Sequence, residues 1–163
     1  MAYMTSLNAT QAEIDAYTGE IDAFVEKLLA GAGESVSVSI AHSCTFQNDI
    51  SLNYYVSESD LTDYTNVFLY IERETYIDGV LTKVTEIIKE YTVTDGNYRF
   101  VYQGIAACEM GDVLNATVYA MKDGSFYESE LDTYSVMTYA YNRLAASEDT
   151  VFKTMLVDML NYG

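Results

Sequence analysis

Residues 66–93 read NVFLYIERETYIDGVLTKVTEIIKEYTV, and this stretch decides the fold class. Residues 66–77 are rich in aromatic and β-branched side chains and are apolar on both faces at 67–71. Asp78-Gly79 then separates this run from a second one that starts at Val80. Asp-Gly between two such runs is a strong hairpin signal, because both turn residues must adopt positive φ. The stretch therefore predicts a strand over 66–77, a two-residue turn, and a strand over 80–93 with a bulge near 86–88.

The pattern of strands and glycine turns continues on both sides of this hairpin. Turn signals recur at Thr94-Asp95-Gly96-Asn97 and at Lys122-Asp123-Gly124-Ser125. Runs with period-2 alternation predict the remaining strands, at 35–40, 45–56, 98–103, 113–121 and 126–129. About seven short strands with turns at regular spacing are typical of an antiparallel β-sandwich.

Helices are expected at both ends of the chain. Thr10 and Glu13 fit a capping box, and one apolar stripe follows through 10–30 at helical spacing: Ile14, Tyr17, Ile21, Phe24 and Leu28. Near the C-terminus, 134–145 and 150–161 each carry an apolar face, with Ser147 as the expected N-cap of the second helix. The predicted fold class is α+β, an antiparallel β-sandwich with one N-terminal and two C-terminal helices.

The composition shift at Gly31 and Gly33 predicts two parts. Residues 1–33 form an amphipathic helix and linker, which could be the tail of a preceding module. Residues 34–163 form the sandwich with its closing helices.

The charge of the chain excludes several kinds of partner. Asp and Glu number 25 against 8 Lys and Arg in 163 residues, for a net charge of −17. Phosphate backbones and anionic membrane surfaces would be repelled. No apolar run is long enough to span a bilayer. We therefore expect a soluble monomer with no nucleic-acid or membrane partner.

The two cysteines, Cys44 and Cys108, leave two interpretations open. Cys44 and Cys108 could form a disulfide that closes a long loop. Alternatively, both could be free thiols that pack as small hydrophobic side chains. His42, the single histidine, shares a predicted strand face with Cys44. A Cys–His dyad is conceivable there, although catalytic pairs are recognised by geometry and not by closeness in sequence.

Acidic residues offer no specific signal for catalysis or metal binding. Glu128, Glu130 and Asp132 could supply the carboxylate pair of a glycoside hydrolase, but such runs are more often solvated faces. Three aspartates next to turns could hold Ca²⁺, but Asp beside Gly is favoured by the turn itself: Asp95, Asp112 and Asp123. We expect no enzyme activity, no metal and no cofactor.

Several segments resemble a β-rich module that recurs in large secreted or wall-bound proteins of gut Clostridia and Ruminococcus relatives. The resemblance covers residues 35–163 and rests on these segments: 47–54 (QNDISLNY), 102–106 (YQGIA), 110–112 (MGD), 134–136 (YSV), 139–142 (YAYN) and 156–163 (LVDMLNYG). Residues 8–15 (NATQAEID) and 24–29 (FVEKLL) are similar to the closing helix of a FIVAR-type repeat. Together these resemblances imply a fragment of a longer exported protein, extracellular or attached to the cell wall, with neighbouring modules.

The function that we expect is non-catalytic binding to a host protein, such as an immunoglobulin or mucin, or to a glycan. The chain has 16 Tyr and no Trp, and Tyr supplies stiff amphipathic contact area. Because Trp, the side chain that stacks most strongly on sugars, is absent, a protein ligand is slightly favoured over a glycan ligand. Six tyrosines near predicted turns or edges are the candidate contacts: Tyr54, Tyr55, Tyr70, Tyr76, Tyr98 and Tyr127. A structural spacer with no ligand of its own is the alternative, and a carboxylate-pair glycoside hydrolase is less favoured.

Overall fold

Three Asp-Gly turns form three hairpins of the structure, as predicted. Each places two successive residues at positive φ: 52° and 78° at Asp78-Gly79, 50° and 74° at Asp95-Gly96, and 51° and 80° at Asp123-Gly124. This type I′ geometry matches the right-handed twist of paired strands. The turns join three pairs of strands: β4 (Thr65–Ile77) to β5 (Val80–Ile88), β6 (Thr92–Thr94) to β7 (Asn97–Ile105), and β8 (Leu114–Lys122) to β9 (Ser125–Glu128).

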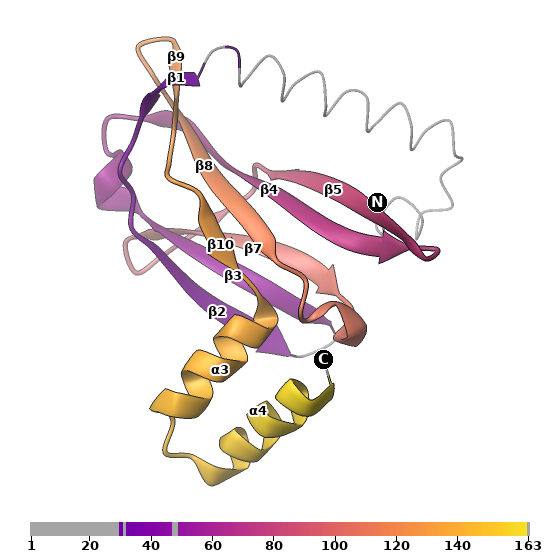
Figure 1. Cartoon of the computed structure of the whole chain (residues 1–163). Coiled ribbons are helices and arrows are strands. Elements are labelled where there is room, and N and C mark those ends of the chain that lie inside the picture. The colour runs from indigo at the N-terminus through magenta and orange to yellow at the C-terminus, as the bar shows by residue number, and fades with distance from the viewer. Residues whose placement is uncertain (1–29, 31, 47–48, 163) are drawn as a thin grey trace.

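The computed structural model describes residues 30, 32–46 and 49–162, which form two β-sheets with a pair of helices at one end (Figure 1). Sheet A has the order β1-β9-β8-β4-β5, where β1 is Ala32–Ser35, and β10 (Asp132–Tyr134) also pairs with β8. Sheet B has the order β2-β3-β7-β6, where β2 is Ile40–Phe46 and β3 is Ile50–Ser57. The α+β sandwich-like fold with two C-terminal helices is confirmed. The predicted N-terminal helix over 10–30 lies outside the described residues.

The core lies between the two sheets. Side chains that point inward from sheet A alternate along β4 and β8, and those from sheet B alternate along β3 and β7. The most deeply buried of them are 0–1% exposed: Leu69, Ile71 and Val118 from sheet A, and Leu52, Val56 and Phe100 from sheet B. The period-2 alternation along β3, β7 and β8 reflects this buried interface, whereas 67–71 on β4 are buried on both faces.

Three predicted strands have different boundaries in the structure. Residues 36–39 lie outside any strand and connect sheet A to sheet B. The Val36 amide donates to the Glu128 carbonyl, and Ser39 accepts from the Ser57 amide and donates to the Asp60 carboxylate. The predicted strand 45–56 is the end of β2 followed by β3, with Phe46 opposite Ile50. The predicted strand 80–93 is β5 in sheet A and β6 in sheet B, and residues 89–91 cross between them.

The strand count and pairing also differ from the prediction. Ten strands occur in the described residues instead of about seven, because long apolar runs divide between the sheets and β10 was not predicted. The β1–β9 pair is parallel, whereas the other described strand pairs are antiparallel. The long connection between β1 and β9 makes room for the crossover that a parallel pair requires.

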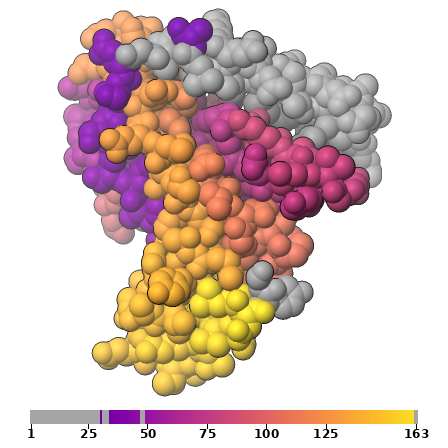
Figure 2. Space-filling model, viewed as in Figure 1, coloured from indigo at the N-terminus to yellow at the C-terminus, as the bar shows by residue number. Residues whose placement is uncertain are grey.

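The closing helices, α3 (Val136–Ala146) and α4 (Thr150–Tyr162), pack against each other at the lower end of the molecule (Figures 1 and 2). The prediction that Ser147 caps α4 is wrong. Asp149 Oδ1 accepts bonds from the Val151 and Phe152 amides, at 2.9 and 3.1 Å, while Ser147 ends α3. In the described part of the chain, no helix is long and apolar enough to cross a membrane.

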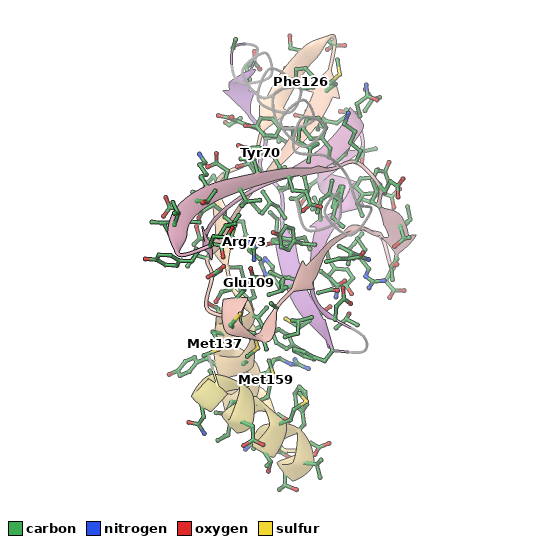
Figure 3. All side chains as sticks on the ribbon, turned by 90° about the vertical axis from the view of Figure 1, so that its right-hand side faces the viewer. Tyr70, Arg73, Glu109, Phe126, Met137 and Met159 are labelled. Carbon is green, nitrogen blue, oxygen red and sulfur yellow. The ribbon has the colours of Figure 1, made fainter. Side chains whose placement is uncertain are left out.

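Short 3-10 helices complete the fold. They are η1 (Glu58–Leu61), after β3, and η2 (Ala107–Glu109), after β7. From α3 and α4, Met137 and Met159 pack against the main core, and Leu156 is fully buried (Figure 3). The helices therefore cover the end of the sandwich.

Candidate ligand-binding site

The six candidate tyrosines do not form one surface. Tyr76 is 71% exposed on β4, whereas Tyr54 is 0% and Tyr70 is 7% exposed. The proposal of Tyr54 and Tyr70 as exposed contacts is corrected, because the sequence pattern shows which residues share a face but not whether that face is covered. Tyr54 points into the core from β3, and Tyr70 belongs to an aromatic cluster on the outer face of sheet A.

The other three candidates are half-buried and lie apart from one another. Tyr55 exchanges a 3.2 Å hydrogen bond with Ser43 on sheet B. Tyr98 packs on Tyr91 with ring centroids 4.7 Å apart, and Tyr127 packs edge-on against Tyr64 at 5.3 Å. Each of these three rings contacts another residue of the chain. Among the six candidates, only the Tyr76 side chain is exposed.

Replacing Tyr54 by phenylalanine should stabilise the protein. The Tyr54 hydroxyl is buried without a hydrogen-bond partner among the described residues, and burial strongly raises its pKa. Removing an unsatisfied buried hydroxyl should raise the free energy of unfolding by up to about 1 kcal/mol, measured by urea denaturation. Tyr98→Phe, at a half-exposed ring, should leave it unchanged. A clear loss of stability in Tyr54→Phe would mean that the hydroxyl bonds an ordered water.

Of the two interpretations left open for the cysteines, the structure shows free thiols, and the conceivable Cys–His dyad is not formed. Cys44 and Cys108 are both free thiols; Cys44 is half-buried on β2 and Cys108 is exposed on η2. Burial raises the pKa of Cys44 to about 12, so its thiol is not a nucleophile near neutral pH. His42 Nε2 lies 2.8 Å from Asp132 Oδ2 and its ring stacks on Tyr134 at 3.8 Å. This pair joins β2 of sheet B to β10 of sheet A.

Most of the acidic residues considered for catalysis or calcium have structural roles, and Glu130 is exposed. Glu128 accepts a 3.2 Å bond from the Tyr119 hydroxyl, and Asp132 pairs with His42. Asp95 and Asp123 are the first residues of type I′ turns. Within the described residues, no cluster of three or more His, Cys, Asp or Glu side chains is arranged to hold a metal ion.

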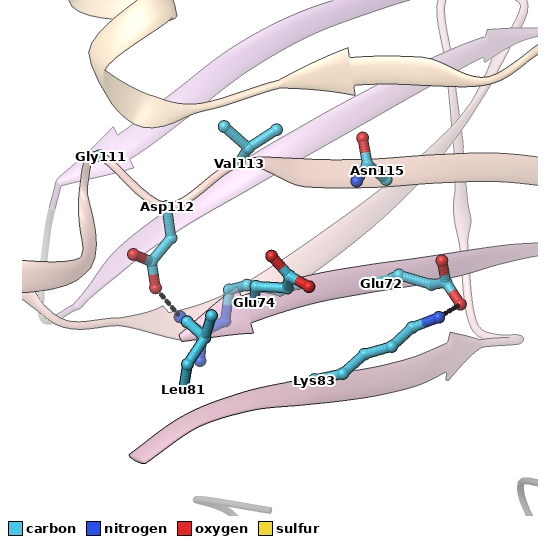
Figure 4. Close-up of a pocket in the computed structure, with 9 residues that line it drawn as sticks. Glu72, Glu74, Leu81, Lys83, Gly111, Asp112, Val113 and Asn115 are labelled. Carbon is cyan, nitrogen blue, oxygen red and sulfur yellow. Dashed lines mark ion pairs between the residues drawn. The ribbon is translucent and has the colours of Figure 1, made fainter. Parts of the chain in front are cut away.

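A polar notch lies where β8 separates from β4. The pairing of these two strands ends at Arg73 opposite Leu114, and the preceding loop, 111–113, bends away. The resulting cavity measures about 370 Å³, a size suited to a small ligand (Figure 4). Its lining comes from three neighbouring segments: Glu72, Arg73 and Glu74 on β4; Leu81 and Lys83 on β5; Gly111, Asp112, Val113 and Asn115 around the start of β8.

Hydrogen bonds and charges orient the side chains along the notch. Lys83 forms an ion pair with Glu72, which also accepts a 2.7 Å bond from the Tyr70 hydroxyl. Burial alone would raise the pKa of Glu72, but these two bonds and the Lys83 charge bring it below its usual value. Glu74, directly opposite Lys83 in the hairpin, makes no salt bridge within the described residues. Its carboxylate is thus available to an incoming group.

The opposite wall of the notch supplies an amide. Asn115 Oδ1 accepts a 3.0 Å bond from Thr133, which orients the side chain and leaves its amide N–H groups as donors. Asp112 lies 3.6 Å from the Arg73 guanidinium. The notch therefore presents hydrogen-bond acceptors on Glu74 and Asp112, and donors on Lys83 and Asn115.

Arg73 anchors the floor of the notch from the core side (Figure 3). Its Nη1 lies 3.1 Å from Glu109 Oε2, and its guanidinium sits 5.8 Å from the centre of the Tyr102 ring. Burial raises the pKa of Tyr102 to about 12 although the Arg73 charge opposes this. The Arg73 side chain is 12% exposed, so the ion pairs tie η2 and the 111–113 loop to β4 in a partly dehydrated setting.

Sequence reasoning singled out Tyr76 and Asp112 in this region but missed the other polar residues of the notch. The Asp78-Gly79 turn sets the register of the hairpin, so Glu74 opposite Lys83 could have been found by counting outward from the turn. Arg73 and Asn115 carried no comparable signal, because their partners lie far away along the chain.

Comparisons with known proteins do not name a family. No family model matches the sequence, and no curated protein matches it. Among solved structures, the crystal structure of a Br derivative of BhCBM56 aligns with 60% of this chain and 90% of its own, at a TM-score of 0.37 and 18% identity. The function must therefore be inferred from the residues of this chain, and the resemblance of 35–163 to a module of exported proteins stays a prediction.

Proposed function

We propose that this chain is a non-catalytic binding module whose notch takes a neutral sugar unit of a glycan. The observation that supports this is the placement of donors and acceptors in a small open cavity beside an exposed aromatic ring. Sugar hydroxyls both donate and accept, so they fit Glu74, Asp112, Lys83 and Asn115 together. Tyr76 lies opposite Leu81, a residue of the notch wall, and its ring is 71% exposed.

The state of the carboxylates argues for binding and against hydrolysis. A glycosidase needs one carboxyl group that stays protonated to act as a general acid. The pKa of Glu72 is lowered by Lys83 and Tyr70, and Asp112 faces the Arg73 guanidinium. Glu72 is therefore unsuited to donate a proton to a leaving group, and Asp112 is placed as a hydrogen-bond acceptor beside a cation.

A second candidate function is docking to a protein through the tip of the β4–β5 hairpin. Four apolar side chains are exposed there at 39–71%: Tyr76, Ile77, Val80 and Leu81. Contiguous exposed apolar side chains mark interaction sites in soluble proteins. A host protein would contact the hairpin tip alone, whereas a sugar would contact both the notch and the tip. A structural spacer would bind a ligand at neither place. For all three, the resemblance of residues 35–163 supports a place outside the cell, within a longer exported protein.

The test is a binding screen of the chain against soluble glycans and host secretory proteins, followed by titration calorimetry on any saturable hit. Tyr76→Ala and Asn115→Ala should each weaken glycan binding by about tenfold, the effect of losing roughly 1.4 kcal/mol. Tyr141→Ala is the matched control, because Tyr141 is 69% exposed on α3, away from the notch.

The pattern of losses separates the candidates. Weaker glycan binding by both Tyr76→Ala and Asn115→Ala supports the sugar site. Loss of protein binding in Tyr76→Ala with Asn115→Ala unaffected supports docking at the hairpin tip. A hit that neither substitution weakens would overturn both proposals, and the absence of any hit would favour the spacer.

A further inference from the structure

The strands of sheet B carry almost no charge, although the chain as a whole is strongly acidic. β2, β3, β6 and β7 contain no Asp or Glu, and their one residue that is always charged is Arg99 on β7. By contrast, β4 of sheet A alone carries Glu72 and Glu74. Sheet B therefore holds a positive charge with no acidic residue on any of its strands.

Arg99 points away from the core. Phe100 and Tyr102 on the same strand are buried in the core, so Arg99 belongs to the opposite, outer face of sheet B. It lies directly opposite Thr92 of β6 and Tyr55 of β3. This row of three side chains crosses three strands and is roughly 10 Å wide. It places a hydroxyl group on each side of the guanidinium.

Hydrogen bonds hold the guanidinium of Arg99 in place. Its Nη2 donates to Asn53 Oδ1 at 2.9 Å. The Asn53 amide nitrogen lies 3.0 Å from the Ser43 hydroxyl and 3.1 Å from the Thr45 hydroxyl, which turns the amide oxygen toward Arg99. Ser43 in turn shares a 3.2 Å bond with the Tyr55 hydroxyl. One network thus joins Tyr55 to Arg99, so a ligand would meet both groups already oriented.

The described residues supply no counter-charge for Arg99. Arg73, the other arginine within a strand, pairs with Glu109 and Asp112, whereas Arg99 makes no salt bridge within the described part of the chain. The Nε atom of Arg99 is buried and has no hydrogen-bond partner there. Buried charges are normally paired, because burial removes their hydration. This position is therefore complementary to a ligand that brings one negative charge.

The surroundings of Arg99 narrow the chemistry of that ligand. A chain of net charge −17 repels a polyanion, so a single carboxylate fits better than an acidic polymer. Protein interfaces have an apolar and aromatic centre, whereas the side chains next to Arg99 offer hydroxyl and amide groups: Thr92, Tyr55 and Asn53. Hydroxyl groups both donate and accept hydrogen bonds, as do those of a sugar ring.

We propose that the outer face of sheet B is a second glycan-binding surface, where Arg99 binds the carboxylate of an acidic sugar at the end of a glycan chain. The N–H groups of Arg99 that Asn53 does not use donate to the carboxylate. The hydroxyls of Tyr55 and Thr92 bond the hydroxyls of the same sugar. This site lies on the other sheet from the notch and takes a charged sugar instead of a neutral one.

The direct test titrates sialyllactose, which ends in a sugar with one carboxylate, into the unmutated, isotope-labelled chain, with lactose as the neutral probe. Sialyllactose should shift the amide signals of Tyr55, Arg99 and Val101 saturably, and lactose should not. Equal shifts with both probes, or no shift of these three signals with sialyllactose, overturn the proposal. The amide signals of Glu74 and Asn115 report on the notch, so failure of one site is distinguishable from failure of the other.

Two variants test the role of the charge. Arg99→Gln removes the cation but keeps an amide donor for Asn53, and should raise the Kd for sialyllactose about tenfold. Arg143→Gln, at an exposed arginine on α3, is the control and should leave the Kd unchanged.

Thr92→Glu keeps the proposal testable if Arg99→Gln fails to fold. It places a carboxylate opposite Arg99 on an exposed strand and should also raise the Kd about tenfold or more. Thr154→Glu adds the same charge to the exposed side of α4 and should leave the Kd unchanged. A Kd that neither Arg99→Gln nor Thr92→Glu alters would overturn the proposal.

Discussion

Arg73→Met should lower the free energy of unfolding by about 3 kcal/mol, measured by urea denaturation. The substitution keeps an apolar stem of similar length but removes the cation that faces Glu109, Asp112 and Tyr102. The carboxylates of Glu109 and Asp112, each only 24% exposed, would be left without their partner. Breaking one side of a buried ion pair costs more than the pair contributes, because the remaining charge stays desolvated.

The matched control is Arg143→Met. Arg143 is exposed on α3, where its guanidinium lies 6.0 Å from the centre of the Tyr139 ring. Its loss should change the free energy of unfolding by no more than about 0.5 kcal/mol. If Arg73→Met and Arg143→Met lowered the free energy of unfolding equally little, the ion pairs of Arg73 with Glu109 and Asp112 would not be stabilising η2 and the floor of the notch.

The same cluster makes stability depend on pH. Burial acts to raise the pKa of Glu109, but the Ala106 amide and Arg73 outweigh it and hold this pKa below its ordinary value of 4.5. A carboxyl group with a lowered folded-state pKa stabilises the fold above its unfolded-state pKa, and this contribution is lost as the pH falls through the folded-state value. The free energy of unfolding should therefore decline less steeply in acid for Arg73→Met than for the unmutated chain.

Asn53→Ala should cost about 2–3 kcal/mol in the free energy of unfolding. Asn53 is 1% exposed, and its amide nitrogen lies 3.0–3.2 Å from the Ser43 hydroxyl, the Ser43 carbonyl and the Thr45 hydroxyl. Its Oδ1 accepts a 2.9 Å bond from Arg99. Alanine would remove these bonds to groups on β2 and β7, and of the three side chains only Ser43 has another side-chain partner among the described residues, Tyr55.

Asn161→Ala is the control for this substitution, because Asn161 is exposed on α4 and should tolerate alanine within about 0.5 kcal/mol. Circular dichroism of Asn53→Ala should still show the sheet signal, since the core-facing side chains of β3 are unchanged. A free energy of unfolding equal to that of the unmutated chain would show that solvent replaces the Asn53 hydrogen bonds without cost.

The hairpins could be predicted from the sequence because their information is local. Asp78-Gly79, Asp95-Gly96 and Asp123-Gly124 carry the backbone preference for the turn within two residues, and the flanking alternation then assigns each side chain to a face. The C-terminal helices were predicted for the same reason: an apolar face repeats every three to four residues within 136–146 and 150–162.

The candidate contacts could be predicted only in part. Tyr54 and Tyr76 lie on successive strands along the chain, β3 and β4, yet Tyr54 is 0% and Tyr76 is 71% exposed. A side-chain period of two determines which residues share a face of a sheet but not what covers that face. The assignment of Tyr54 as a contact failed because its side chain points from sheet B into the core, and the layer that covers it comes from sheet A, many residues away along the chain.

By itself, the sequence determined the turns, the C-terminal helices and the acidic character of the chain, since each depends on neighbouring residues or on composition. The tertiary structure alone decided that 80–93 divides between two sheets and that β8 leaves β4 at Leu114 to open the notch. It also brought Arg73 to Glu109 and Asp112, and His42 to Asp132. These contacts join residues 36 to 90 positions apart. Such pairs form only when the elements that carry them pack together, and no local sequence pattern indicates them.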